Sequence, residues 1–165
     1  MAPDSTARPH RPPDIAAFAA DIERITNEGL IDELLALFAP DAVADWIMDG
    51  AHDHHRGIDA IRAATAELVG VGKALGLHVH KTVQCADADS IVLTWTGGFG
   101  TGDCQFGTEI WTFRDGLVVH QQMYSYLDVR SSTSPLASLR LLAVAPKVVA
   151  SLVKYRWRNH TLTRR

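Results

Sequence analysis

Residues 105–129 read QFGTEIWTFRDGLVVHQQMYSYLDV, and this stretch decides the fold. Two runs rich in aromatic and β-branched residues flank the turn Arg-Asp-Gly at 114–116, a pattern that predicts an antiparallel hairpin. Upstream, residues 77–85 and 91–99 form two more runs of the same kind. Strands joined by short turns are usually neighbours in the sheet, so we expect a four-stranded antiparallel meander.

The N-terminal part of the chain predicts an arm followed by helices. Residues 1–13 are rich in Pro and Arg and have no apolar periodicity, which indicates a disordered arm. Asp14 then caps a helix that ends near Gly29, and apolar residues recur along it at helical spacing. Two further helices are expected at residues 31–38, closed by a proline, and at residues 58–71.

A hairpin is expected between the second and third helices. Residues 42–48 read as a strand, Asp49-Gly50 is a strong hairpin turn signal, and residues 51–56 form the short return strand. The order helix, helix, hairpin, helix and meander predicts an α+β fold. No glycine-rich motif opens a helix, so a phosphate-cradling loop is not expected.

Composition places the chain among ordinary globular proteins. Its 165 residues, 47% of them hydrophobic, fit one domain with a buried core. Cys85 and Cys104 are too few for a disulfide scaffold and suit a reducing compartment. Because no apolar run resembles a signal peptide or reaches transmembrane length, we expect a cytoplasmic protein.

Charge is distributed unevenly along the chain. Residues 129–165 carry eight Lys or Arg and no acid, whereas residues 1–128 hold eight basic against nineteen acidic residues, a net −11. The acidic body has no cation cluster for phosphates, so nucleic acid is not expected as a partner. Residues 131–165 are expected to form a basic amphipathic helical tail. The tail either covers the sheet or the pocket of its own or a neighbouring subunit, or makes peripheral membrane contact through residues 134–158.

Three stretches carry a family resemblance: LLALFAPDAVADW at 34–46, HRGIDAIRAA at 55–64 and GTEIWTFRDGLVV at 107–119. With the order of elements, they resemble the nuclear transport factor 2-like superfamily, and within it the ketosteroid isomerase and SnoaL-like polyketide cyclase group. The resemblance implies a domain over residues 14–130, in which a cone-shaped, curved mixed sheet packs against three helices. It also implies a pocket for an apolar ligand, no metal or organic cofactor, and a homodimer. Because this superfold hosts many activities, the resemblance specifies function less well than fold.

Asp45 is the first catalytic candidate. It lies in the middle of a predicted strand, where Asp is disfavoured, and the resemblance places a general base on this strand. Counting from Asp41, the family position falls on Trp46, so Asp45 reaches it only if a bulge shifts the strand. The alternative is an aspartate on the solvent face of an edge strand.

Glu109 and His80 are the other two catalytic candidates. Glu109 lies four residues before Phe113, where the resemblance implies a buried, protonated acid that hydrogen-bonds an oxyanion. It alternates with Trp111, and burial among aromatics disfavours the charged form; the alternative is a surface glutamate. The imidazole of His80 suits proton transfer, and the dehydratase branch implies a catalytic His on this strand. His78 and His80 can instead be exposed on a polar strand face.

Further side chains are expected to line the pocket. They are Phe18, Trp46, His78, Trp95, Trp111, Tyr124 and Tyr126. A zinc site is not expected at Asp49, His52, Asp53, His54 and His55, because adjacent strand residues point to opposite faces.

The sequence leaves three functions open. The first is a cofactor-independent acid–base enzyme of the isomerase, dehydratase or cyclase type, acting on an apolar steroid, polyketide or terpenoid. The second is a binding protein with the same pocket and no turnover. The third is a membrane-peripheral module directed by the basic tail.

Overall fold

The structure is a computed structural model that describes residues 14–127, 129, 142–143, 145–151 and 153–154. The chain divides into two units, one within Met1–Val129 and the other within Arg130–Arg165. The arm expected at residues 1–13 lies outside the described residues, as does most of the tail expected at residues 131–165. No helix in the described part of the chain is long and apolar enough to cross a membrane. The homodimer, the membrane contact and the cytoplasmic location stay predictions.

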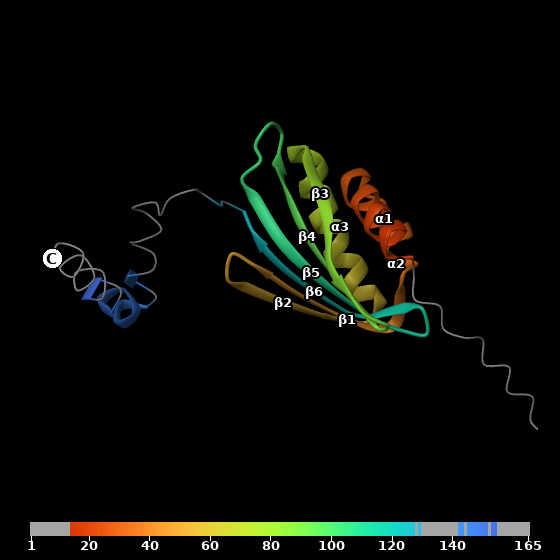
Figure 1. Cartoon of the computed structure of the whole chain (residues 1–165). Coiled ribbons are helices and arrows are strands. Elements are labelled where there is room, and N and C mark those ends of the chain that lie inside the picture. Colours follow the sequence, from red (N-terminus) through yellow and green to blue (C-terminus); the bar gives the residue numbers. More distant parts are fainter. Residues whose placement is uncertain (1–13, 128, 130–141, 144, 152, 155–165) are drawn as a thin grey trace, which may run out of the picture. The chain divides into compact units, whose positions relative to one another are not determined.

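Six strands form one curved sheet in the order β2-β1-β6-β5-β4-β3, and helices lie against one of its faces (Figure 1). The parallel pair is β1 with β6, and the other pairs are antiparallel. The strands are β1 (Phe38–Met48), β2 (Ala51–Arg56), β3 (Leu77–Ala86), β4 (Ser90–Phe99), β5 (Gln105–Arg114) and β6 (Leu117–Tyr126). The helices are α1 (Ile15–Glu28), α2 (Ile31–Leu35) and α3 (Ile58–Leu75). The predicted α+β fold with a curved mixed sheet is confirmed.

Local sequence signals set the ends of α1 and of the first hairpin. The Asp14 carboxylate accepts hydrogen bonds from the backbone N–H groups of Ala16 and Ala17, and satisfies donors that the helix leaves free. At the β1–β2 turn, Asp49 and Gly50 have φ values of 47° and 88°. Two positive φ angles are what a two-residue hairpin turn requires, so the predicted turn is confirmed.

The ends of two helices differ from the sequence prediction. The second helix ends at Leu35 rather than at residue 38, because Pro40 lies within β1, next to a register shift between Phe38 and Val43. Proline lacks the N–H that a regular strand needs, and an irregularity of this kind accommodates it. The third helix continues past Gly72 to Leu75, and Gly72 packs so closely on Leu77 that an added Cβ would lie 3.2 Å from that side chain.

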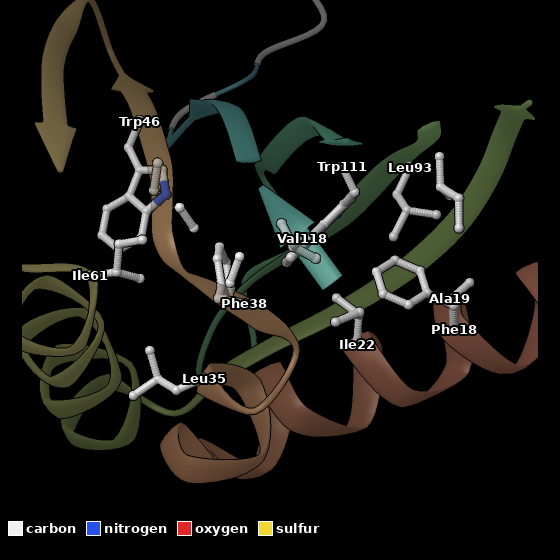
Figure 2. Packing of buried hydrophobic residues seen from close by; sticks show 14 residues of the cluster. Phe18, Ala19, Ile22, Leu35, Phe38, Trp46, Ile61, Leu93, Trp111 and Val118 are labelled. Atoms are coloured by element: carbon white, nitrogen blue, oxygen red, sulfur yellow. The ribbon is translucent and has the colours of Figure 1, made fainter. Parts of the chain in front are cut away.

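The core lies between the helices and one face of the sheet (Figure 2). Trp111 of β5 is 1% exposed, and its ring meets the Phe18 ring edge-on at 5.4 Å between centroids. Phe18 also meets Phe113 edge-on at 5.3 Å. Aromatic pairs in this geometry add to the stabilisation that burial itself gives. Phe18 was expected to line the pocket, and its place is in this core.

Phe18→Ala tests the importance of this aromatic group. Removing a buried phenyl ring leaves a cavity, so we expect the free energy of unfolding to fall by about 3–4 kcal/mol. Urea unfolding measures the change. Phe106→Ala is the matched control, since Phe106 is 37% exposed and its loss should cost less than about 1 kcal/mol. Equal losses in the two variants would contradict this account of the core.

Candidate active-site cavity

A cavity of about 500 Å³ lies within the first unit. The inner face of the sheet and the helices contribute its lining, and apolar side chains dominate it. Three of its residues are the large aromatics Trp46, Trp95 and Trp111. A cavity of this size and polarity is typical of sites that enclose small apolar molecules.

Strand register determines which side chains share the inner face. Lys81 of β3 pairs with Trp95 of β4, which pairs with Gly107 of β5, which pairs with Ser125 of β6. Directly paired residues point to the same side of a sheet, so these four positions form one row. Lys81, Trp95 and Ser125 all line the cavity. Glu109 lies one row along the sheet, two residues after Gly107.

An ion pair is buried at this face. The Lys81 and Glu109 side chains are 2% and 5% exposed, and the Nζ–Oε1 distance is 2.5 Å. The second oxygen of Glu109 accepts a hydrogen bond from Trp111 Nε1 at 3.1 Å. Removing both charges from water is costly, and such pairs are often no more stabilising than apolar side chains of similar volume. An ion pair beside an apolar cavity is therefore a candidate for function.

Three buried polar atoms along the cavity have no hydrogen-bond partner in the described part of the chain. They are Thr65 Oγ1, Trp95 Nε1 and Ser125 Oγ. By contrast, the indole nitrogen of Trp46 donates to Gln121 Oε1 at 3.0 Å. Buried polar groups in folded proteins are nearly always paired, so unpaired groups beside a cavity point to a bound molecule.

Asp45 does not line the cavity. The strand does have an irregularity, between Phe38 and Val43, but Trp46 lines the cavity and its neighbour Asp45 lies on the opposite face. There its carboxylate accepts hydrogen bonds from His54 Nδ1 at 2.8 Å, His120 Nε2 at 2.7 Å and His52 Nε2 at 2.9 Å. These bonds, that from His54 above all, lower the pKa of Asp45 well below its usual range. The sequence hypothesis of a general base in the pocket does not fit this position.

The two strand histidines also lie away from the cavity lining. His80 is 74% exposed and pairs with Glu23 of α1 at 3.0 Å. His78 pairs with Asp103 at 2.8 Å, and this hydrogen bond raises the pKa of His78. The polar-face alternative therefore describes both side chains better than a pocket role does.

The tyrosines of β6 are likewise absent from the lining. Tyr126 is 54% exposed, and Tyr124 accepts a hydrogen bond from Gln122 on the same strand. Of the ten residues selected from the sequence, those along the cavity are Glu109, Trp46, Trp95 and Trp111.

The sequence reasoning missed Lys81, the partner of Glu109. A signal was present, because Lys81 alternates with the apolar residues Val79 and Val83 along β3. The adjacent histidines drew attention to the opposite face. Ser125 and Thr65 gave no signal, since small hydroxyl residues are common at such positions.

Among the described residues, no group of three or more His, Cys, Asp or Glu side chains is arranged to hold a metal ion. The buried polar groups along the cavity include the Lys81 ammonium, the Glu109 carboxylate, the Thr65 and Ser125 hydroxyls and the Trp95 indole N–H.

The structure is an α+β fold in which a curved six-stranded sheet and its helices line a mostly apolar cavity. The SnoaL-like domain family matches residues 17–121, and the chain belongs to this family. No curated protein matches the chain.

Solved structures share the fold. An NTF2-like protein of unknown function from Burkholderia xenovorans LB400 has a TM-score of 0.55 at 18% identity, covering 74% of this chain and 90% of its own. A candidate ketosteroid isomerase from Kribbella flavida has a TM-score of 0.51 at 18% identity, with coverages of 72% and 81%. SalBIII, an epoxide hydrolase/cyclase-like enzyme with a role in pyran ring formation in the polyether salinomycin, has a TM-score of 0.51 at 15% identity, with coverages of 67% and 88%. Identities this low show a shared fold and not a shared activity.

Lys81→Met tests how much the buried Lys81–Glu109 ion pair contributes to the free energy of unfolding. It leaves the Glu109 carboxylate buried without its cation, so the free energy of unfolding should fall by about 3–5 kcal/mol. Adding Glu109→Gln in the same chain removes the second charge and should recover most of that loss. Urea unfolding of the wild type, both single variants and the double variant completes the cycle. A double variant as unstable as the sum of the singles would mean that the two charges do not interact.

Asp45→Asn tests the histidine cluster on the other face. Because hydrogen bonds to a charged group are lost, the free energy of unfolding at pH 5 should fall by about 1–2 kcal/mol. The pKa of Asp45 is lower in the folded than in the unfolded state, where it is about 4. The carboxylate therefore stabilises the folded state fully above about pH 4, and this stabilisation decreases as the pH falls toward the folded-state pKa. The difference between wild type and variant should therefore be smaller at pH 3 than at pH 5.

The control for this pH series is Asp41→Asn. Asp41 pairs with Arg114 in an exposed salt bridge, so its loss should change the free energy of unfolding by less than about 1 kcal/mol. An Asp45→Asn difference that stays constant from pH 5 to pH 3 would rule out the assigned linkage.

Proposed function

We propose that the protein is an acid–base enzyme of the isomerase, dehydratase or cyclase type, acting on an apolar small molecule held in the cavity. The observation that carries the proposal is the Lys81–Glu109 ion pair, buried beside a hollow of about 500 Å³ with a mostly apolar lining. A steroid, polyketide or terpenoid skeleton has the size and polarity that such a cavity accepts.

Glu109 is the proposed proton carrier. Each carboxylate oxygen has more than one acceptor position, so the bonds from Lys81 and Trp111 leave capacity for a ligand proton. Glu109 would remove a proton from one ligand atom and return it to another, which leaves the protein unchanged after an isomerisation.

Lys81 is the proposed electrophilic partner. Its ammonium has three donors and uses one on Glu109, so the others can stabilise negative charge that develops on a ligand oxygen. In an apolar cavity such an interaction is stronger than in water. The two residues would therefore act together, one on the proton and one on the oxygen.

Exchange of carbon-bound hydrogen for deuterium tests this proposal without a known substrate. Wild-type protein is incubated in deuterium oxide with a panel of apolar ketones, and mass spectrometry measures deuterium incorporation next to the carbonyl. We expect catalysed exchange with at least one ketone. General base catalysis contributes about 10²–10⁴-fold, so Glu109→Gln should lower the rate by about that factor.

Two further variants make the test specific. Glu67→Gln changes an exposed glutamate of α3 and controls for a general effect of losing a carboxylate. Asp45→Asn distinguishes the two faces of the sheet. If Asp45→Asn abolishes exchange and Glu109→Gln does not, the catalyst is on the outer face and the proposal fails.

The second candidate is a binding protein without turnover. It is favoured by the fact that both oxygens of Glu109 are already engaged, and by the position of Asp45 outside the cavity. Ketones that bind the wild type but show no catalysed exchange across the panel would select this function.

A further inference from the structure

We infer that the indole N–H of Trp95 and the hydroxyl of Ser125 together hold an oxygen atom of the ligand, and that this oxygen is uncharged, as in a ketone. The inference rests on the proposed function, because it concerns the polar contacts of the same cavity. It adds the chemical group that the ligand must carry and the two residues that select for it.

Register places the two donors on either side of one glycine. Gly107 of β5 pairs with Trp95 on one neighbouring strand and with Ser125 on the other. A Cβ built on Gly107 would lie 2.3 Å from Cε2 and 2.4 Å from Nε1 of Trp95. The pyrrole side of the Trp95 ring, with its nitrogen, therefore lies over Gly107.

Both donors are buried and unpaired. Trp95 is 7% exposed and Ser125 is 4% exposed, and both residues line the cavity. Among the residues that the structure describes, neither Trp95 Nε1 nor Ser125 Oγ has a hydrogen-bond partner. An indole N–H can only donate, so what satisfies Trp95 must be an acceptor. A ligand oxygen between the Trp95 indole and the Ser125 hydroxyl would accept a hydrogen bond from each.

The charges along the cavity decide between a neutral and an anionic oxygen. The charged residues of its lining are Lys81, Glu109, Lys73 and Glu28, two cations and two anions. Lys81 is opposite Trp95 in the sheet, but Glu109 neutralises it. No surplus positive charge is left for a carboxylate, whose burial without a cation is unfavourable. A carbonyl oxygen meets both requirements.

Three probes with one carbon skeleton test the inference: 2-decalone, decalin and decalin-2-carboxylate. The measurement is the ¹H–¹⁵N spectrum of the tryptophan indoles, with the Trp95 signal assigned from its absence in Trp95→Phe. We expect 2-decalone to bind most tightly and to move the Trp95 indole proton downfield. Decalin should bind more weakly, with little movement of that signal.

Ser125→Ala carries the decisive comparison. The loss of one hydrogen bond should weaken 2-decalone binding about fivefold and leave decalin binding unchanged. Trp46→Phe is the matched control, since the Trp46 indole already donates to Gln121, and it should affect the two probes alike. If Trp95→Phe does not fold, Ser125→Ala still supplies the test.

The outcomes separate the two proposals. If neither decalin nor 2-decalone binds the wild type, the cavity is not a ligand site and the proposed function fails with the inference. If both bind equally, or if Ser125→Ala leaves their ratio unchanged, the cavity remains a ligand site and the Trp95–Ser125 assignment is wrong. Tighter binding of the carboxylate than of the ketone would also overturn the assignment.

Discussion

The parallel pairing of β1 with β6 joins two parts of the sheet that lie far apart in the sequence. The N-terminal hairpin and the C-terminal meander would each be a small sheet with one apolar face and little to cover it. Pairing of Trp46 with Met123 and of Met48 with Ser125 brings them into a single curved surface. The same pairing places Trp46 beside Gln121, whose side chain accepts the indole hydrogen bond. The cavity exists because both parts contribute to its wall.

The elements of the fold could be read from the sequence because their signals are local. Asp14, Asp49 and Gly50 do in the structure what their residue types favour. Turn residues and the alternation of apolar and polar residues also located the strands of the meander to within a few residues. Pro40 was misassigned, because a proline that ends a helix and one at a strand irregularity look alike in a single sequence.

The site was less predictable, because it depends on which face each strand turns inward. Glu109 was found because it alternates with Trp111, an aromatic that had to be buried. Lys81 was passed over because a lysine in a strand is ordinarily exposed, and only contact with a distant carboxylate explains its burial. Asp45 was chosen as a catalytic candidate because an aspartate is unusual in the middle of a strand. Its hydrogen bonds with histidines on the two neighbouring strands explain why an aspartate is accommodated there.

The absence of a Cβ atom at Gly107 affects the volume of the cavity. Because residue 107 has no side chain, the Trp95 ring packs directly on the backbone of β5, and the ring lines the cavity. Any larger residue there would lift the ring off the strand and into the cavity. The size of residue 107 therefore sets the volume of the cavity, although a bound ligand would contact the Trp95 ring and not residue 107 itself.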